Sequence, residues 1–292
     1  MGIIRQMKKE RFDFVCSVGS SCLCATSLRD AGLRLSSGPF DWLLGPSLKD
    51  RVELIANDFA GWFERDDFEF LGNPEKFDHD SYMNRRTGYK FAHDFEIGKP
   101  FEKSFPEVRD KYARRIERFY GLIRASRRVL LVWLENPVDD DRPSDEDVAA
   151  SLETLKRKFP GVKVEILVVD RAPDDTPGGE LERRDGYWRA LCPYRRKATD
   201  MRGTVRPWDV DTRPIQSLLS NFETRDYRSA VARRGHDVAS RRAKYAYFGA
   251  RGPVGYAISR LQVKVCKLLL NRLRRKGVDM RHVFEVQIGA WK

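Results

Sequence analysis

The chain has 292 residues and a net charge of +12, and 41% of its residues are hydrophobic and 34% charged. This composition excludes collagen-like and wholly disordered chains. No apolar run reaches the roughly 18 residues of a transmembrane helix, and the basic N-terminus lacks the apolar stretch of a secretory signal. Five cysteines without a framework spacing are typical of a reducing compartment. We therefore expect a cytoplasmic protein.

The first third of the chain begins with a strand and continues with helices. The apolar run at residues 12–18 predicts a buried strand. Residues 22–31 predict a helix that ends at Gly32, which is a typical helix stop. Apolar side chains at helical spacing predict a second helix over residues 47–63.

The same alternation continues in the middle of the chain. Helical spacing predicts a helix over residues 108–123, and apolar runs predict strands over residues 129–134 and 162–169. Between these strands, Ser144 is a candidate helix N-cap, and Asp147 completes a capping-box pattern. Strands that alternate with helices in this way favour a mainly parallel sheet.

These elements predict the following organisation. Residues 12–170 are expected to form a three-layer α/β core domain with a mainly parallel sheet of Rossmann-like or SGNH-like type. Within it, residues 66–106 are rich in Asp, Gly, Asn and Pro and are expected to form a long loop or lid. Residues 171–240 are expected to form an irregular extension rich in Arg and Pro, and residues 241–292 a basic helical C-terminal region.

The positive charge lies almost entirely at the C-terminus. The last 52 residues contain 13 Lys and Arg but only 2 Asp and Glu. Residues 256–276 combine this charge with apolar side chains, which is typical of a helix that docks on an anionic membrane from its cytoplasmic side. The alternative is a helix packed on the sheet with a solvated basic face. Residues 187–196 contain Arg, Tyr and Trp, but no nucleic-acid-binding pattern, so nucleic acid is not an expected partner.

The sharpest functional signal follows the first predicted strand, in Ser17-Val-Gly-Ser-Ser-Cys22. Ligands bind at the carboxyl ends of parallel strands, and a helix N-terminus favours a thiolate. Cys22 is therefore a candidate nucleophile, and N–H groups from Gly19 and Ser20 onward could hold an oxyanion. The alternative is a tight turn in which Ser20 or Ser21 caps the helix and Cys22 is a small buried residue. Polar residues after later strands are expected at the same edge: Glu135, Asn136 and Asp170.

A thiol nucleophile needs a base, and His93 is the candidate. It lies in the aromatic segment 89–95, beside Asp94, which we include as a candidate catalytic residue. The alternative is a structural histidine that the backbone satisfies. His79 lies in an Asp-His-Asp tripeptide, which is more typical of a polar loop than of a metal site. The sequence has no Cys-x-x-Cys, His-Glu-x-x-His or Gly-rich phosphate motif, so we expect no metal and no cofactor.

Four blocks in order resemble a family of papain-like cysteine peptidases found in bacteria and viruses. They are Ser17-Val-Gly-Ser-Ser-Cys22, Ser37-Gly-Pro-Phe-Asp-Trp42, Phe91-Ala-His-Asp-Phe95 and Tyr112-Ala-Arg-Arg115. The resemblance covers about residues 12–170, with Ser21 where the family usually has Asn. It implies a Cys22–His93 pair. Relatives often lie among surface-polysaccharide genes, which implies a role with glycans at the inner face of the membrane.

The block that contains Pro39-Phe-Asp-Trp42 has two interpretations. Asp41 could orient a histidine or hold a sugar hydroxyl, while Trp42 could stack on a sugar ring. Alternatively, Phe40 and Trp42 fill the core and Asp41 caps the turn. We include Asp41 and Trp42 among the candidate substrate-binding residues because the block is part of the family resemblance.

The turn after the first strand also resembles that of the GSCFA and SGNH-hydrolase group. Alignment of Gly19 with the glycine of that group's Gly-Asp-Ser turn places Ser21, rather than Cys22, at the nucleophile position. Papain-like enzymes carry their cysteine on a long helix that no sheet strand precedes. Because an apolar strand precedes Cys22, we expect residues 12–170 not to adopt the papain fold.

Two classes of function follow from these observations. The first is a thiol-dependent hydrolase or acyl transferase that acts on a small-molecule, glycan or peptide substrate, with an SGNH-like esterase that uses Ser21 as its variant. The second is a non-catalytic protein that binds an anionic glycan or a lipid-linked precursor in the same cleft. We favour the enzyme, and the sequence predicts no particular oligomeric state.

Overall fold

The computed structural model describes residues 9–73, 79–137, 141–173, 176, 181–194 and 210–224. The chain divides into two compact units, residues 1–234 and 235–292, and every described residue belongs to the first. The amphipathic helix expected over residues 256–276 therefore lies outside the described residues. Within the described part of the chain, no helix has the length and apolar character needed to cross a membrane.

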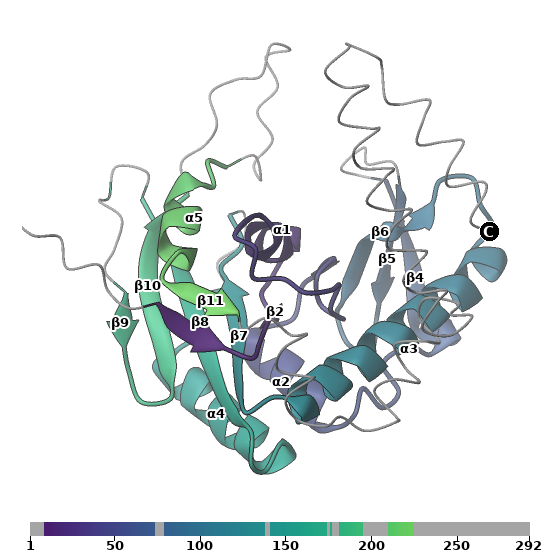
Figure 1. The fold of residues 1–292 in the computed structure, drawn as a ribbon. Coiled ribbons are helices and arrows are strands. Elements are labelled where there is room, and N and C mark those ends of the chain that lie inside the picture. Colours follow the sequence, from purple (N-terminus) through teal and green to yellow (C-terminus); the bar gives the residue numbers. More distant parts are fainter. Residues whose placement is uncertain are drawn as a thin grey trace, which may run out of the picture. The chain divides into compact units, whose positions relative to one another are not determined.

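The centre of the first unit is a five-stranded sheet in the order β2-β7-β8-β10-β9 (Figure 1). Four of its strands run parallel: β2 (Phe14–Ser17), β7 (Arg128–Leu134), β8 (Lys163–Ala172) and β10 (Tyr187–Pro193). The edge strand β9 (Glu182–Arg183) is antiparallel to β10. Because the four strands are parallel, their carboxyl ends meet at one edge of the sheet.

Helices cover both faces of this sheet (Figure 1). The helices α1 (Cys22–Asp30) and α5 (Arg213–Leu219) pack with one apolar cluster, and three other helices lie on the opposite side: α2 (Leu48–Ala56), α3 (Phe101–Ala125) and α4 (Asp145–Lys158). Successive residues of β7 alternate between the two clusters, so Leu130 faces α1 while Leu131 faces the other cluster. Both faces of β7 are therefore buried, as its unbroken apolar sequence requires.

A second sheet of four antiparallel strands has the order β3-β6-β5-β4. Its strands are β3 (Leu43–Leu44), β4 (Phe68–Gly72), β5 (His79–Asn84) and β6 (Lys90–Glu96). Three of them lie in residues 66–106, which we expected to be an irregular loop, and α3 also begins in that segment at Phe101. That expectation was wrong. Aromatic rings on β4 and β6 pack against α3, as Phe68 does on Phe105 and Phe91 on Tyr112, and this packing orders the segment.

The α/β fold is confirmed, but the two large sheets and the short pair β1 (Glu10–Phe12) and β11 (Phe222–Thr224) together are mixed rather than mainly parallel. Parallel and antiparallel pairings are equal in number among the described residues. The described residues of 171–240 also include regular elements, namely β9, β10, α5 and β11. The sheet therefore extends beyond residue 170.

Helix caps predicted from the sequence are present at both ends of the first helix and at the start of α4. Ser21 is the N-cap of α1, and Gly32 follows its C-cap with a φ of 72°. The Ser144 hydroxyl accepts the N–H of Asp147 at 3.0 Å at the start of α4. These local polar signals need no tertiary partner, so they can be recognised in the sequence alone.

The helix expected over residues 47–63 is shorter than predicted and ends at Ala56. Asp58 and Phe59 have φ values of 59° and 57°, which no α-helix accommodates. Phe59 is nevertheless buried, and its ring lies 5.4 Å from that of Trp62. Phe59 therefore reaches the core from a turn that follows α2, although its spacing in the sequence predicted a longer helix.

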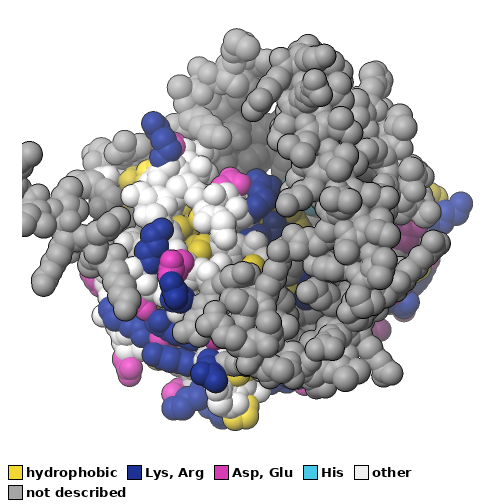
Figure 2. Space-filling view, in the orientation of Figure 1, with side chains coloured by type: hydrophobic (Ala, Val, Ile, Leu, Met, Phe, Trp, Pro, Cys, Tyr) yellow, Lys and Arg dark blue, Asp and Glu magenta, His cyan; other side chains and the backbone are white. Residues whose placement is uncertain are grey.

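A charged cluster holds the amino end of the sheet. The fully buried Glu165 of β8 accepts hydrogen bonds from Arg128 at 2.8 Å and from Arg183 at 3.0 Å, and Lys163 lies 2.9 Å away. Lys and Arg side chains gather at the lower left of the face in Figure 2, where β1 and β9 lie in Figure 1. The cluster joins β7, β8 and β9 through one carboxylate.

Candidate functional site

The turn between β2 and α1 is fastened to the end of β7. A Cβ atom on Gly19 would lie 2.4 Å from the Leu134 nitrogen and 2.6 Å from the Trp133 Cα, so no larger residue fits. Ser20 donates both its N–H, at 3.4 Å, and its hydroxyl, at 3.1 Å, to the Leu134 carbonyl. The donors of Ser20 that we considered for an oxyanion thus hold the turn itself.

Cys22 is the first residue of α1 and is half-buried, whereas Ser21 before it is buried. The Ser21 hydroxyl accepts the N–H of Leu23 at 3.4 Å and caps the helix. Burial raises the pKa of the Cys22 thiol, and a hydrogen bond from its own backbone N–H lowers it only in part. The thiol is therefore protonated near pH 7, and its reaction as a nucleophile requires a base.

His93 lies in a bulge of β6. The pairing with β5 passes from Asp80 opposite Phe95 to Tyr82 opposite Phe91, so three residues of β6 face one residue of β5. Bulges of this kind turn a side chain away from its regular direction. The His93 ring lies edge-on against Trp42, with a centroid distance of 5.9 Å.

The carboxylate of Asp94 binds two side chains of α3. One oxygen accepts the Lys111 ammonium at 2.6 Å, and the other accepts the Tyr112 hydroxyl at 2.7 Å. The side chain is only 2% exposed. These bonds give Asp94 a structural role in the contact between β6 and α3.

The segment with Asp41 and Trp42 is a tightly bonded turn. The Asp41 Oδ2 atom accepts the Arg34 guanidinium at 2.6 Å and the N–H of Gly38 at 2.9 Å. Burial raises the pKa of Asp41, and Arg34 opposes this effect. Asp41 thus caps the turn and Phe40 is fully buried, while Trp42 is half-buried between Arg34 and His93.

Arg51 of α2 connects the Cys22 turn to this segment, and the sequence analysis missed it. Its guanidinium is fully buried, donates to the Pro46 carbonyl at 3.0 Å, and lies 3.4 Å from the Ser20 carbonyl and 3.5 Å from that of Leu43. Burial lowers the pKa of Arg51. Arg51 stands three residues after Leu48 and four before Ile55, on the buried stripe of the helix, and that position is the signal in the sequence.

The polar residues expected at the carboxyl edge of the sheet are buried there. Glu135 accepts the N–H of Arg171 at 2.6 Å, and Asp170 accepts the Arg189 guanidinium at 2.6 Å. Burial raises the pKa of Glu135 despite nearby arginines. Glu135 directly follows Leu134, whose carbonyl holds Ser20, so this acidic group lies beside the turn that carries Cys22.

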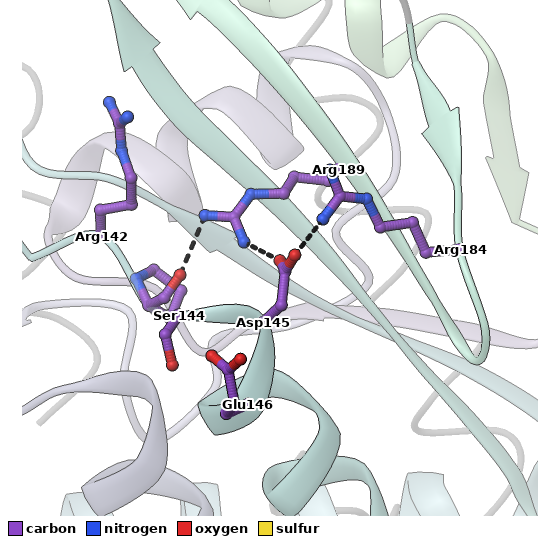
Figure 3. Close-up of a pocket in the computed structure, with 7 residues that line it drawn as sticks. Arg142, Ser144, Asp145, Glu146, Arg184 and Arg189 are labelled. Atoms are coloured by element: carbon purple, nitrogen blue, oxygen red, sulfur yellow. Dashed lines mark hydrogen bonds and ion pairs between the residues drawn. The ribbon is translucent and has the colours of Figure 1, made fainter.

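A pocket of about 390 Å³ opens at the start of α4, lined by Arg142, Pro143, Ser144, Asp145, Glu146, Arg184 and Arg189. Figure 3 shows Asp145 between Arg184 and Arg189, with Arg142 apart from them. Because these two guanidinium groups are already paired, the pocket is an ion-pair network that fastens α4 to β10. It contains no Cys or His among the described residues that line it.

The described residues include no group of three or more His, Cys, Asp or Glu side chains that could hold a metal ion. His79 lies on β5, where it pairs with Glu96 of β6. The structure thus brings Trp42 and His93 into contact, holds Cys22 on a turn linked to the same segment, and directs Asp94 toward α3.

Comparison with known proteins gives one viral relative and one family. The chain is 26% identical over 154 residues to "Uncharacterized protein R408" of Acanthamoeba polyphaga mimivirus, a match that covers 48% of this chain and 68% of the relative. No solved structure matches the chain. A family model described as "Putative papain-like cysteine peptidase (DUF1796)" matches residues 13–172, which is more than half of the chain and includes both Cys22 and His93. The chain therefore belongs to this papain-like cysteine peptidase family, as the four sequence blocks indicated.

Proposed function

We propose that the first unit is a cysteine-dependent hydrolase in which Cys22 is the nucleophile and His93 the general base. The observation that carries the proposal is the place of Cys22, half-buried at the first position of α1 and at the carboxyl end of a parallel strand. Ligands bind at this end of open parallel sheets.

A chain of contacts supports the pairing of Cys22 with His93. Arg51 lies between the carbonyls of Ser20, in the Cys22 turn, and of Leu43, in β3. Leu43 in turn pairs with Phe91 of β6, two residues before His93. Trp42, next to Leu43, touches the His93 ring. The Cys22 turn and the strand that carries His93 are thus both linked to residues 42 and 43, which supports the pairing.

The proposed reaction starts from the neutral thiol. His93 takes the Cys22 proton as the sulfur attacks the acyl carbon, and the same proton then passes to the leaving group as a thioester forms. Water hydrolyses the thioester and releases the acid and the thiol. Transfer to another nucleophile would make the enzyme an acyl transferase, and the acyl group could belong to a peptide, a glycan or a small molecule.

The surroundings of the two residues favour Cys22 over Ser21 as the nucleophile. The Ser21 hydroxyl is buried and caps α1, whereas the Cys22 side chain is partly exposed. A role in surface-polysaccharide metabolism, with attachment to the inner membrane face through residues 256–276, remains a proposal that rests on the family resemblance and on charge.

The test is the pH dependence of Cys22 alkylation by iodoacetamide, followed by mass spectrometry. Cys192 is an internal reference, because burial raises its pKa to about 12. In the wild type, we expect Cys22 to be alkylated even at pH values well below 9.0, the ordinary pKa of a thiol, because His93 accepts the proton. His93→Ala should slow it about a hundredfold at pH 7.

His79→Ala is the matched control, since His79 is also half-buried and lies on the neighbouring strand. It should leave the alkylation rate unchanged. If the two histidine variants behave alike, or if Cys22 is no more reactive than Cys192, the paired site is wrong and a non-catalytic binding protein becomes the better hypothesis. Loss of hydrolysis in Ser21→Ala but not in Cys22→Ala would instead assign Ser21 as the nucleophile.

A further inference from the structure

Three arginines surround the turn that precedes Trp42. Arg34 follows α1 and donates to the Ser37 hydroxyl at 2.7 Å and to Asp41 at 2.6 Å. Arg118 of α3 donates to the Ser37 carbonyl at 3.1 Å. Arg115 lies one helical turn earlier on α3, with its guanidinium 5.0 Å from the centre of the Tyr112 ring.

Arg34 and Arg115 together carry more positive charge than the carboxylate of Asp41 can balance. Asp41 is ion-paired with Arg34, and its carboxylate also feels the charge of Arg115, which acts to lower the Asp41 pKa. Arg115 has no ion pair with any residue that the structure describes. The neighbouring pair of Lys111 and Asp94 adds no net charge.

Arg34 and Arg115 each have a buried donor without an acceptor. These donors are the Arg34 Nε and the Arg115 Nη1 atoms, which have no hydrogen-bond partner in the described part of the chain. A buried donor that lacks an acceptor is costly, and more so when it carries charge. The guanidinium groups of Arg34 and Arg115 therefore have capacity for another anion, unlike Arg184 and Arg189, which share Asp145.

We propose that Arg34, Arg115 and Arg118 form a subsite that binds an oxyanion, the carboxylate or phosphate group of a substrate. The planar fork of a guanidinium matches both groups and binds them through paired hydrogen bonds. The Arg34 guanidinium carbon lies 5.7 Å from the centre of the Trp42 ring. The same ring contacts the ring of His93, the candidate base. Assignment of the anion to a substrate rests on the proposed function, whereas the binding of an anion does not.

The experiment titrates the full chain with inorganic phosphate and, separately, with acetate, by calorimetry at an ionic strength held constant with sodium chloride. Saturable binding of phosphate or acetate above the chloride background is expected, and the tighter of the two identifies the oxyanion. Arg115→Ala should weaken this binding about tenfold or more, because it removes hydrogen bonds between charged groups. Arg115→Lys keeps the charge but not the fork, and should also bind more weakly.

Arg114→Ala is the matched control, since it removes the same charge from the adjacent, exposed position of α3. It should leave the affinity unchanged. Equal losses of anion affinity in the Arg114 and Arg115 variants, or no saturable binding at all, would contradict the proposed subsite. Cys22→Ala should bind phosphate as the wild type does, so this experiment can fail or succeed independently of the His93 test. The thermal unfolding midpoint of each variant shows that it is folded.

Discussion

Single side chains and single atoms decide how the Cys22 turn is placed. The backbone of β7 approaches Gly19 so closely that a methyl group would overlap three of its main-chain atoms. Arg51 supports the turn from the other side through the Ser20 carbonyl. The turn is thus held between a strand and a buried cation, and Cys22 follows directly after it.

Gly19→Ala should lower the free energy of unfolding by about 1–3 kcal/mol, because the contacting atoms belong to the backbone and cannot move aside. It should also change the alkylation rate of Cys22. Urea unfolding measures the stability. Gly121→Ala is the control and should not lose stability. A Cβ atom there has no atom within 4 Å apart from those of its own helix, and alanine favours a helix over glycine by about 1 kcal/mol. Wild-type stability in the Gly19 variant would show that the turn can relax.

At the scale of elements, the contact between β6 and α3 determines where His93 lies. Asp94 fixes the strand to the helix through Lys111 and Tyr112, and the rings of Phe91 and Tyr112 pack 5.5 Å apart beside it. Because β6 is fixed on this side, the bulge directs His93 toward Trp42. Through these contacts, Asp94 helps to fix the position of the strand that carries His93.

Asp94→Asn should reduce stability by about 1–3 kcal/mol, since it removes a buried charge that accepts two hydrogen bonds. The pH at which Cys22 alkylation reaches half its maximum rate should remain unchanged. Asp110→Asn, at an exposed ion pair of the same helix, should change stability by no more than about 0.5 kcal/mol. A large shift of this half-maximal pH in Asp94→Asn would indicate that Asp94 is a catalytic residue.

The sequence predicted those elements whose signals are local or uniform. The parallel strands β2, β7 and β8 contain the apolar runs that predicted them, and Ser21 and Ser144 mark helix starts. The strand β10 was missed because Arg189 interrupts its apolar pattern, and only tertiary partners, Asp170 and Asp145, neutralise that charge. The second sheet was missed because long-range aromatic packing, rather than local pattern, orders its polar strands.

The same division holds for the candidate site. Cys22 and His93 could be identified from residue type and setting, because a cysteine at a strand-to-helix turn and a histidine among aromatics are visible in the sequence. The direction of Asp94 and the burial of Arg51 could not, because they depend on contacts between elements distant along the chain.

At the scale of the whole molecule, the two ends of the five-stranded sheet differ in chemistry. The carboxyl end carries the candidate site and the buried Glu135, whose pKa is raised by burial. The amino end carries Glu165. Burial raises the pKa of Glu165, but hydrogen bonds from Arg183, Arg128 and Lys163 outweigh that effect and bring it from 4.5 to about 2.

The lowered pKa of Glu165 predicts how the stability of the protein depends on pH. Because the folded pKa of Glu165 lies below its unfolded value of 4.5, its contribution is complete above that pH and is lost as the pH falls toward 2. Glu165→Gln should therefore be much less stable than the wild type at pH 7, and the difference should narrow steadily below pH 4.5. Urea midpoints at pH 7, 4 and 3 measure it. A difference that stays constant with pH would show that another group holds the amino end.

The bulge of β6 also bears on how relatives of this chain should be compared. Between Phe91 and Phe95, β6 has two more residues than β5 uses opposite it. A relative that lacks those two residues could keep the sheet and its aromatic core, yet it would have no position from which a histidine reaches the tryptophan. The number of residues between the two phenylalanines is therefore a criterion, independent of overall identity, for deciding which family members can share this site.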